Sequence, residues 1–171
     1  MFSNKTIKGL TERQHRIYKF LRANPVGVLS TVSPNSEPHG VVIYFAIDKE
    51  FNVSFLTKTG TRKYDNLMKN THAMLVVFDQ DSQTVAQVIG EAVEITDNFI
   101  ANEVATEVLK ISQNTSQSGT PPISKLEAGG YTCFRIVPKQ IRIASYDKSD
   151  PSDYRRIFES IESFVLKDDE N

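Results

Sequence analysis

Short apolar segments of strand length, separated by short polar turns, constrain the fold of this chain more than any other feature. Seven such segments occur, at residues 26–32, 39–47, 53–58, 73–78, 84–95, 131–137 and 140–145. Several connections have hairpin composition; residues 33–38 (SPNSEP), for example, are all turn formers except the glutamate. Many strands joined by such turns predict a mainly β fold, an antiparallel barrel, rather than the strand–helix alternation of a Rossmann sheet.

Helices are predicted at the periphery of this barrel. Four are expected, at residues 11–23, directly after Gly60, at 97–111 and at 151–166. In the second of them Leu67 and Met68 supply the apolar anchors. Gly90 interrupts the long strand 84–95, which predicts a bulge or sharp bend of the kind that curls a sheet. No internal repeat is evident, so we expect residues 1–171 to form a single domain.

The composition excludes several classes of function. With 20 basic and 21 acidic side chains, the net charge is -1, and the broad positive surface of a nucleic-acid-binding protein is not expected. No apolar run approaches about 20 residues, so neither a membrane-spanning helix nor membrane association is expected. The first residues lack the apolar centre of a signal peptide. The single cysteine, Cys133, excludes an internal disulfide and fits a reducing compartment, so we expect a cytoplasmic protein.

The stretch 51–70 (FNVSFLTKTGTRKYDNLMKN) reads as a strand, a tight turn and a helix. Gly60 permits the turn, and Thr59 or Thr61 is placed to cap the helix. Arg62 and Lys63 follow in the first turn, where helix N–H groups are unpaired and the dipole is positive. Hydroxyls, amides and two cations at one point are the chemistry of a phosphate site.

A plain surface helix with two solvated basic residues accounts for the same pattern. The dipole argues against it, because helix N-termini favour acidic side chains and Arg62 and Lys63 oppose that preference. A bound anion would remove this conflict, and both interpretations stay open at this point.

No other group of residues forms a recognisable catalytic centre. The three histidines, His15, His39 and His72, lack the spacing of metal ligands, so no metal site is predicted. Cys133 alternates within a strand and reads as a packed thiol. An enzyme without its own nucleophile or acid–base pair depends on a cofactor for its chemistry. The polar segment 112–125 is the longest stretch without regular signals, and we expect it to be a loop that governs substrate access.

Four pieces of the chain together resemble the pyridoxamine 5'-phosphate oxidase-like family of FMN-binding split β-barrels. They are VGVLSTVSPNSEPHGVVIYFAI, FLTKTGTRKYDNL, the pair AMLVVF and AQVIGEAVEI, and FRIVPKQIRIASY. The resemblance covers about residues 22–146. It implies a split barrel that is usually a twofold homodimer, with FMN at the subunit interface.

The resemblance also assigns roles to individual residues. Arg62 and Lys63 would bind the FMN phosphate with help from Thr61, and Leu56 and Thr57 would lie along the ribityl chain. Main-chain atoms of four residues would back the isoalloxazine ring: Gly40, Val41, Val42 and Ile43. The family often adds an amide side chain from the fifth strand; that position falls on Val85 here, and Gln87, on the same strand face, would replace it.

One departure bears on the substrate. Pyridoxamine phosphate oxidases end in a segment with Trp and Arg residues, whereas this chain contains no Trp. Synthesis of pyridoxal phosphate is therefore not expected, and the resemblance implies an FMN-dependent oxidoreductase acting on another small molecule or electron acceptor. The alternatives are a non-catalytic flavin or haem binding or storage protein, a deazaflavin-dependent reductase on the same fold, and a structural barrel with an empty site.

Overall fold

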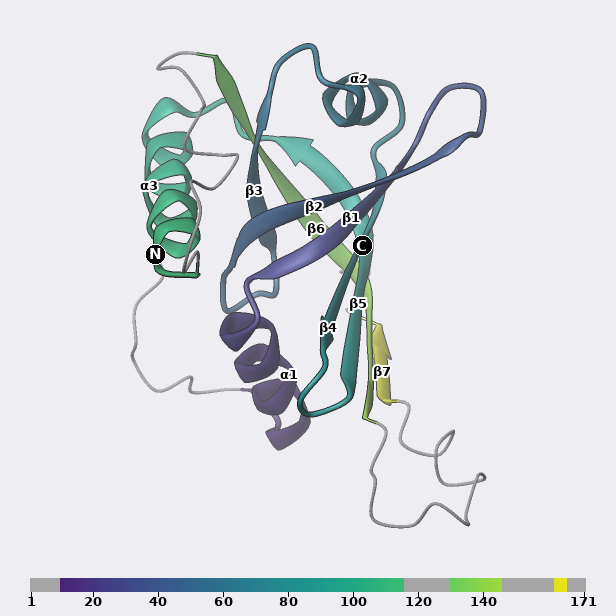
Figure 1. The fold of residues 1–171 in the computed structure, drawn as a ribbon, viewed down its shortest axis with the longest axis vertical. Coiled ribbons are helices and arrows are strands. Elements are labelled where there is room, and N and C mark those ends of the chain that lie inside the picture. Colours follow the sequence, from purple (N-terminus) through teal and green to yellow (C-terminus); the bar gives the residue numbers. More distant parts are fainter. Residues whose placement is uncertain (1–9, 116–129, 146–161, 166–171) are drawn as a thin grey trace, which may run out of the picture.

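The computed structural model describes residues 10–115, 130–145 and 162–165. Within them the chain forms three helices and seven strands (Figure 1). In chain order they are α1 (Glu12–Ala23), β1 (Val26–Val32), β2 (Pro38–Ile47), β3 (Val53–Lys58), α2 (Arg62–Lys69), β4 (His72–Asp79), β5 (Thr84–Glu94), α3 (Asn98–Thr115), β6 (Tyr131–Ser145) and β7 (Glu162–Val165).

The strands form one antiparallel sheet in the order β3-β2-β1-β4-β5-β6-β7. An additional pairing between β3 and β6 closes the first six strands into a barrel. The predicted mainly β fold, a barrel with peripheral helices, is therefore confirmed. Among the described helices, none is long and apolar enough to cross a bilayer.

The barrel is split along β6, which changes partner halfway. Its first part, residues 131–136, pairs with β3, whereas residues 140–143 pair with β7. The sequence predicted two strands joined by a turn at Pro138 and Lys139, and this prediction is wrong, because β6 is continuous from Tyr131 to Ser145. Ile89 and Gly90 of β5 face Gln140 and Pro138, so the register shifts there and Lys139 of β6 is the extra residue. This bulge in β6 accommodates Pro138, which has no N–H to donate.

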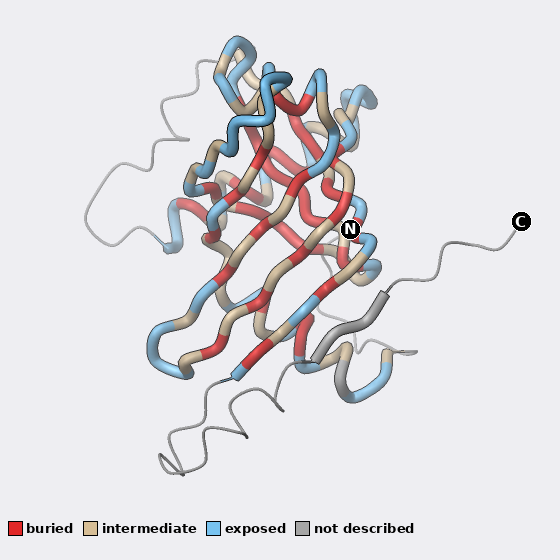
Figure 2. Tube along the Cα trace, turned by 90° about the vertical axis from the view of Figure 1, so that its right-hand side faces the viewer, coloured by how far each residue is buried: buried red, intermediate tan, exposed pale blue. Residues whose placement is uncertain are grey.

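Two apolar clusters stabilise the barrel. The larger cluster fills its interior and includes Phe45, Phe55 and Phe134, with α1 packed at one end through Ile17 and Leu21. The smaller one lies between the barrel wall and α3. More and less buried residues alternate along β1 and β5, as a closed sheet with one inward face requires, whereas β3 is buried on both faces because α3 covers its outer side (Figure 2).

Three further expectations differ from the structure. The helix predicted over 151–166 is not formed at Glu162–Val165, which is strand β7; residues 151–161 lie outside the described part. The strand satisfies backbone groups of β6 beyond the end of its pairing with β3. The segment 112–125 begins as helix, because α3 continues to Thr115; its later residues are likewise not described. Met68 is 52% exposed and does not anchor α2, whereas Leu67 is buried.

Candidate functional site

The turn from β3 into α2 leaves the start of the helix without a side-chain cap. Gly60 takes the left-handed conformation, with φ of 73°, and Thr61 occupies the N-cap position. The Thr61 hydroxyl nevertheless donates to the carbonyl of Lys58 at 2.8 Å and lies 3.0 Å from the hydroxyl of Thr57. The predicted capping by Thr59 or Thr61 is therefore not made, and within the described chain no side chain accepts from the first-turn amides of α2.

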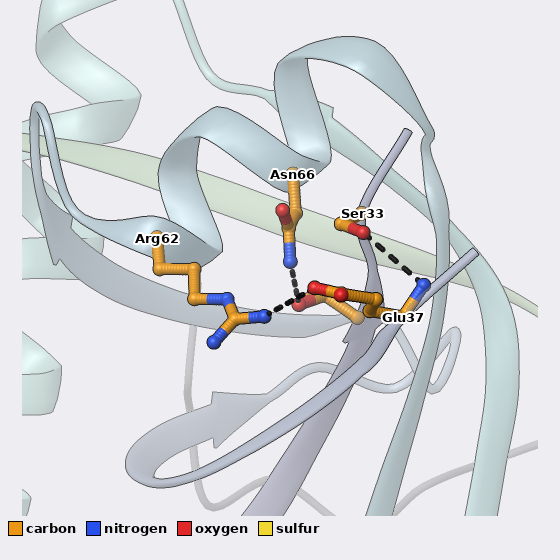
Figure 3. A network of polar contacts seen from close by, with 5 residues as sticks. Ser33, Glu37, Arg62 and Asn66 are labelled. Carbon is orange, nitrogen blue, oxygen red and sulfur yellow. Dashed lines mark hydrogen bonds and ion pairs between the residues drawn. The ribbon is translucent and has the colours of Figure 1, made fainter. Parts of the chain in front are cut away.

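One face of α2 is attached to the hairpin formed by β1 and β2. Asn66 donates from Nδ2 to Oγ1 of Thr31 at 3.0 Å, and both side chains are buried. One turn earlier, Arg62 Nη2 lies 3.1 Å from Glu37 Oε2, and both of these side chains are more than half exposed (Figure 3). The buried bond, worth about 1 kcal/mol, fixes the helix on the sheet, whereas the exposed ion pair adds less.

The tip of the hairpin holds Glu37 in place. The Ser33 amide donates to the Glu37 carbonyl at 2.9 Å, and Ser33 Oγ accepts from the Glu37 amide at 3.1 Å (Figure 3). Ser36, with φ of 63°, supplies the left-handed step of the turn. The backbone of Glu37 is therefore fixed, while its carboxylate reaches across to α2.

Lys63 differs from Arg62 because it has no ionic or hydrogen-bonding partner among the described residues. Its side chain is half-buried, and the resulting desolvation lowers the pKa of its ammonium group. It also stands in the first turn of an uncapped helix, where the dipole disfavours a cation. A phosphate at this point would neutralise Lys63 and accept from the helix amides together.

An unpaired strand edge lies beside this turn. The pairing of β2 with β3 covers only 45–47 in β2, which leaves residues 38–44 without a strand partner on that side in the described chain. The Phe45 amide donates to Pro25 on the opposite side, so by alternation Gly40 and Val42 direct their N–H and C=O groups to the unpaired edge. The two strands diverge towards α2 (Figure 1). At Gly40 an added Cβ would meet one atom, Val28 Cγ1 at 3.5 Å, so a flat group has room to approach.

The remaining predicted residues on β2 and β3 use their side chains in packing, and the N–H and C=O groups of Val41 and Ile43 point towards β1. Val41 packs against the barrel core and Ile43 belongs to it, while Leu56 is buried in the cluster under α3. Thr57 is also buried, but its hydroxyl reaches Thr61. The structure thus gathers Thr57, Thr61 and the two cations at the start of α2.

Gln87 is separate from this group within one chain. A cross-strand row on the outer face of the barrel leads from Val42 through Val28 and Val76 to Gln87. Three strand spacings amount to roughly 14 Å. The row is apolar up to Gln87, which is half-buried. A ligand bound at Val42 is therefore too far from Gln87 of the same chain to contact its amide. If such a ligand does contact a Gln87 amide, that residue comes from a second copy of the chain.

Sequence reasoning missed Glu37, Asn66 and Thr31. Asn66 follows Arg62 by four positions, so the two side chains lie on the same face of a helix, and this spacing indicates that Asn66 is close to the predicted phosphate site. Glu37 was read simply as part of a turn, and its partner lies 25 residues away.

The other candidate side chains have no evident chemistry. Nδ1 of His39 is buried and has no hydrogen-bond partner among the described residues; His39 lies opposite Thr31 on the inward face. Burial raises the pKa of the Cys133 thiol to about 11, which makes it a poor nucleophile at neutral pH. In the described part of the chain, no group of three or more potential metal ligands occurs.

Known proteins resemble this chain in sequence and in fold. A reductase from Streptomyces rimosus, 5a,11a-dehydrotetracycline/5a,11a-dehydrooxytetracycline reductase, is 36% identical over 76 residues, which span 41% of this chain and 54% of the reductase. A putative pyridoxamine 5'-phosphate oxidase from Listeria innocua has the same fold, with a TM-score of 0.62 and 22% identity over 77% of this chain and 98% of its own. A haem binding protein from Mycobacterium smegmatis also has the fold, with a TM-score of 0.66 and 8% identity over 91% of this chain and 59% of its own.

The family comparison covers the barrel and both candidate cations. The model described as pyridoxamine 5'-phosphate oxidase matches residues 14–143, which include β1 to β5, α2 and most of β6. This match extends over well more than half of the chain. The chain therefore belongs to the pyridoxamine 5'-phosphate oxidase family.

Proposed function

We propose that this protein is an oxidoreductase that binds FMN at the start of α2 and along the unpaired edge of β2. The observation that carries the proposal is Lys63, a half-buried cation without a partner in the described chain, placed in an uncapped first helical turn. A terminal phosphate is the ligand that this arrangement favours. Membership of the family and the local likeness to a reductase support an oxidoreductase.

The residues have distinct tasks in this proposal. Lys63, Arg62 and Thr61 hold the phosphate, and Thr57 with the main chain of Leu56 adjoins the ribityl chain. The main chain of β2 from Gly40 through Val41 and Val42 to Ile43 would lie along the ring system, with the N–H and C=O groups of Gly40 and Val42 directed to it. Bound FMN would supply hydride or electron transfer, which no described side chain provides.

The active unit is proposed to be a homodimer with the flavin at the subunit interface. Val42 and Val28 are 63% and 41% exposed, and they are neighbours on adjacent strands. Phe78 of β4 is 56% exposed on the same side of the sheet. An apolar face of this kind is normally covered, most often by a twofold partner. In the proposed dimer the partner would supply a second Gln87 to the flavin, since three strand spacings, roughly 14 Å, separate Gln87 from Val42 within one chain.

A non-catalytic flavin or haem carrier is the second candidate, since one protein of this fold is a haem binding protein. The oxidoreductase would turn over a small-molecule substrate or an electron acceptor, whereas the carrier would not. The protein is further proposed to work in the cytoplasm, because Cys133 is a free, buried thiol.

Spectroscopic titration tests the proposal. Purified protein, first stripped of bound pigment, is titrated with FMN, riboflavin and haemin separately, and flavin fluorescence and absorbance are recorded. We expect FMN to bind more than tenfold tighter than riboflavin, and the complex to be reduced by a nicotinamide donor and reoxidised by a quinone or similar acceptor. Equal affinity for FMN and riboflavin contradicts the phosphate site. Tight FMN binding without turnover of any donor or acceptor favours the carrier, and preference for haemin favours a haem protein.

A further inference from the structure

We propose that Glu37 is a built-in competitor for the phosphate site, a carboxylate that holds Arg62 until a phosphate monoester displaces it. This inference rests on the proposed FMN site and deepens it. It assigns to a hairpin side chain the control of how tightly the site binds its anion.

The position of Glu37 supports this role. Its backbone is fixed by two hydrogen bonds to Ser33, so the carboxylate is presented to α2 by a rigid turn. Its Oε2 lies 3.1 Å from Nη2 of Arg62, in the first turn of the helix, where an incoming anion would also approach (Figure 3). A carboxylate and a phosphate oxygen compete for the same guanidinium donors.

The two cations of the turn are therefore not equivalent. Arg62 is already paired with Glu37, whereas Lys63 has no such partner in the described chain. A phosphate meets Lys63 without a competitor, whereas at Arg62 it must displace Glu37 to take the Nη2 donor and to escape repulsion by the carboxylate. A phosphate monoester carries almost two negative charges near neutral pH, against one on the carboxylate, so it wins this exchange.

Separating the Glu37 carboxylate from Arg62 costs little free energy. Glu37 can therefore compete with a phosphate without blocking the site permanently. Glu37 and Arg62 are 65% and 56% exposed at their side chains, so the released carboxylate is rehydrated at once. The anchoring of α2 does not depend on this pair, because the buried bond between Asn66 and Thr31 holds the helix independently.

The test compares FMN with riboflavin, which lacks the phosphate, by fluorescence titration of the full chain. Glu37→Gln keeps the size of the side chain and removes its charge. We expect the FMN affinity to rise about two- to fivefold, the range given by an exposed ion pair, with riboflavin unchanged. Glu103→Gln, on the exposed face of α3, is the matched control and should leave both affinities unchanged.

Repeating the Glu37→Gln substitution in a protein that lacks Arg62 shows whether the gain in FMN affinity depends on Arg62. In Arg62→Met protein there is no guanidinium to release, so adding Glu37→Gln should change the FMN affinity less than twofold. A full gain in that background overturns the proposal, as does an unchanged or weaker FMN affinity of Glu37→Gln itself. If wild-type protein binds FMN no better than riboflavin, the phosphate site fails as a whole; if FMN is preferred but Glu37→Gln leaves the ratio unaltered, the role of Glu37 alone is overturned.

Discussion

Gly90 of β5 lies directly opposite Pro138 of β6, at the point where the split strand changes partner. A Cβ built on Gly90 would lie 2.1 Å from the carbonyl oxygen of Val137, which is backbone and cannot move aside. The close passage of β6 at its bulge therefore requires a residue without a side chain at position 90.

Gly90→Ala should destabilise the protein by about 3 kcal/mol or more, because it forces apart two backbones in a closed barrel. Gly40→Ala is the matched control, since its added Cβ meets an ordinary contact of 3.5 Å. Urea unfolding followed by circular dichroism measures both. Equal midpoints for the two variants would contradict the close approach.

Lys63→Ala should weaken FMN binding about tenfold or more while riboflavin binding changes little, because a charge-assisted phosphate contact contributes about 1.5–3 kcal/mol. Lys69→Ala, at the exposed end of the same helix, is the control. If the double variant Arg62→Ala, Lys63→Ala keeps wild-type FMN affinity, the phosphate does not bind there.

Stability without ligand should depend on pH through Lys63. Desolvation lowers its pKa in the folded protein below the ordinary 10.5, so between these two values the unfolded chain binds more protons than the native one. The free energy of unfolding therefore rises with pH in that window, and the full penalty of burying the cation persists below it. Lys63→Met should be more stable than wild type at pH 7, with the difference shrinking as the pH approaches 10.5. A difference that is constant with pH would exclude this cause.

Asn66→Ala should destabilise the fold by about 1–2 kcal/mol, because it removes a buried hydrogen bond and leaves Thr31 without its donor. The double variant Asn66→Leu, Thr31→Val replaces both partners with apolar groups and should recover part of the loss. Chemical denaturation of the wild type, Asn66→Leu, Thr31→Val and the double variant measures the coupling between the two sites. Additive effects of the two sites would mean that the bond contributes nothing of its own.

Val42→Asp should convert the proposed dimer to a monomer near 19.3 kDa, because it places a charge in the apolar outer face. Val93→Asp is a suitable control, since Val93 is similarly exposed, at 53%, on a different part of the sheet. Light scattering after size exclusion decides the outcome. A wild-type protein that is already monomeric at micromolar concentration would contradict the proposed interface.

Local patterns in the sequence were sufficient for most of the barrel. Strand β1 has the predicted bounds, and the alternation in β3 and the cations after Gly60 predicted a strand followed directly by α2. Each of these predictions depends on residues within a few positions of one another, where steric and hydrogen-bonding preferences act directly.

The predictions that failed depended on distant partners. Pro138 and Lys139 have the composition of a turn, but they form a bulge within a continuous β6, because β5 pairs with the strand on both sides of them and Gly90 lies opposite Pro138. The helical spacing after residue 151 gave no sign that part of that segment pairs with β6. Likewise, Arg62 is recognisable as a cation from its neighbours, but its engagement by Glu37 follows from the way the hairpin folds back over α2.

The unpaired edge of β2 makes the protein vulnerable to self-association when nothing covers it. Among the described residues, 38–44 have no strand partner on the side towards β3, and the open N–H and C=O groups there, beside exposed valines, are a template for adding a strand from another chain. Pro38 at the start of the strand protects the edge at that end alone. A ligand bound along this edge would also cover it and so prevent the addition of a strand. We therefore expect protein produced without the ligand to aggregate more readily than the ligand-bound protein.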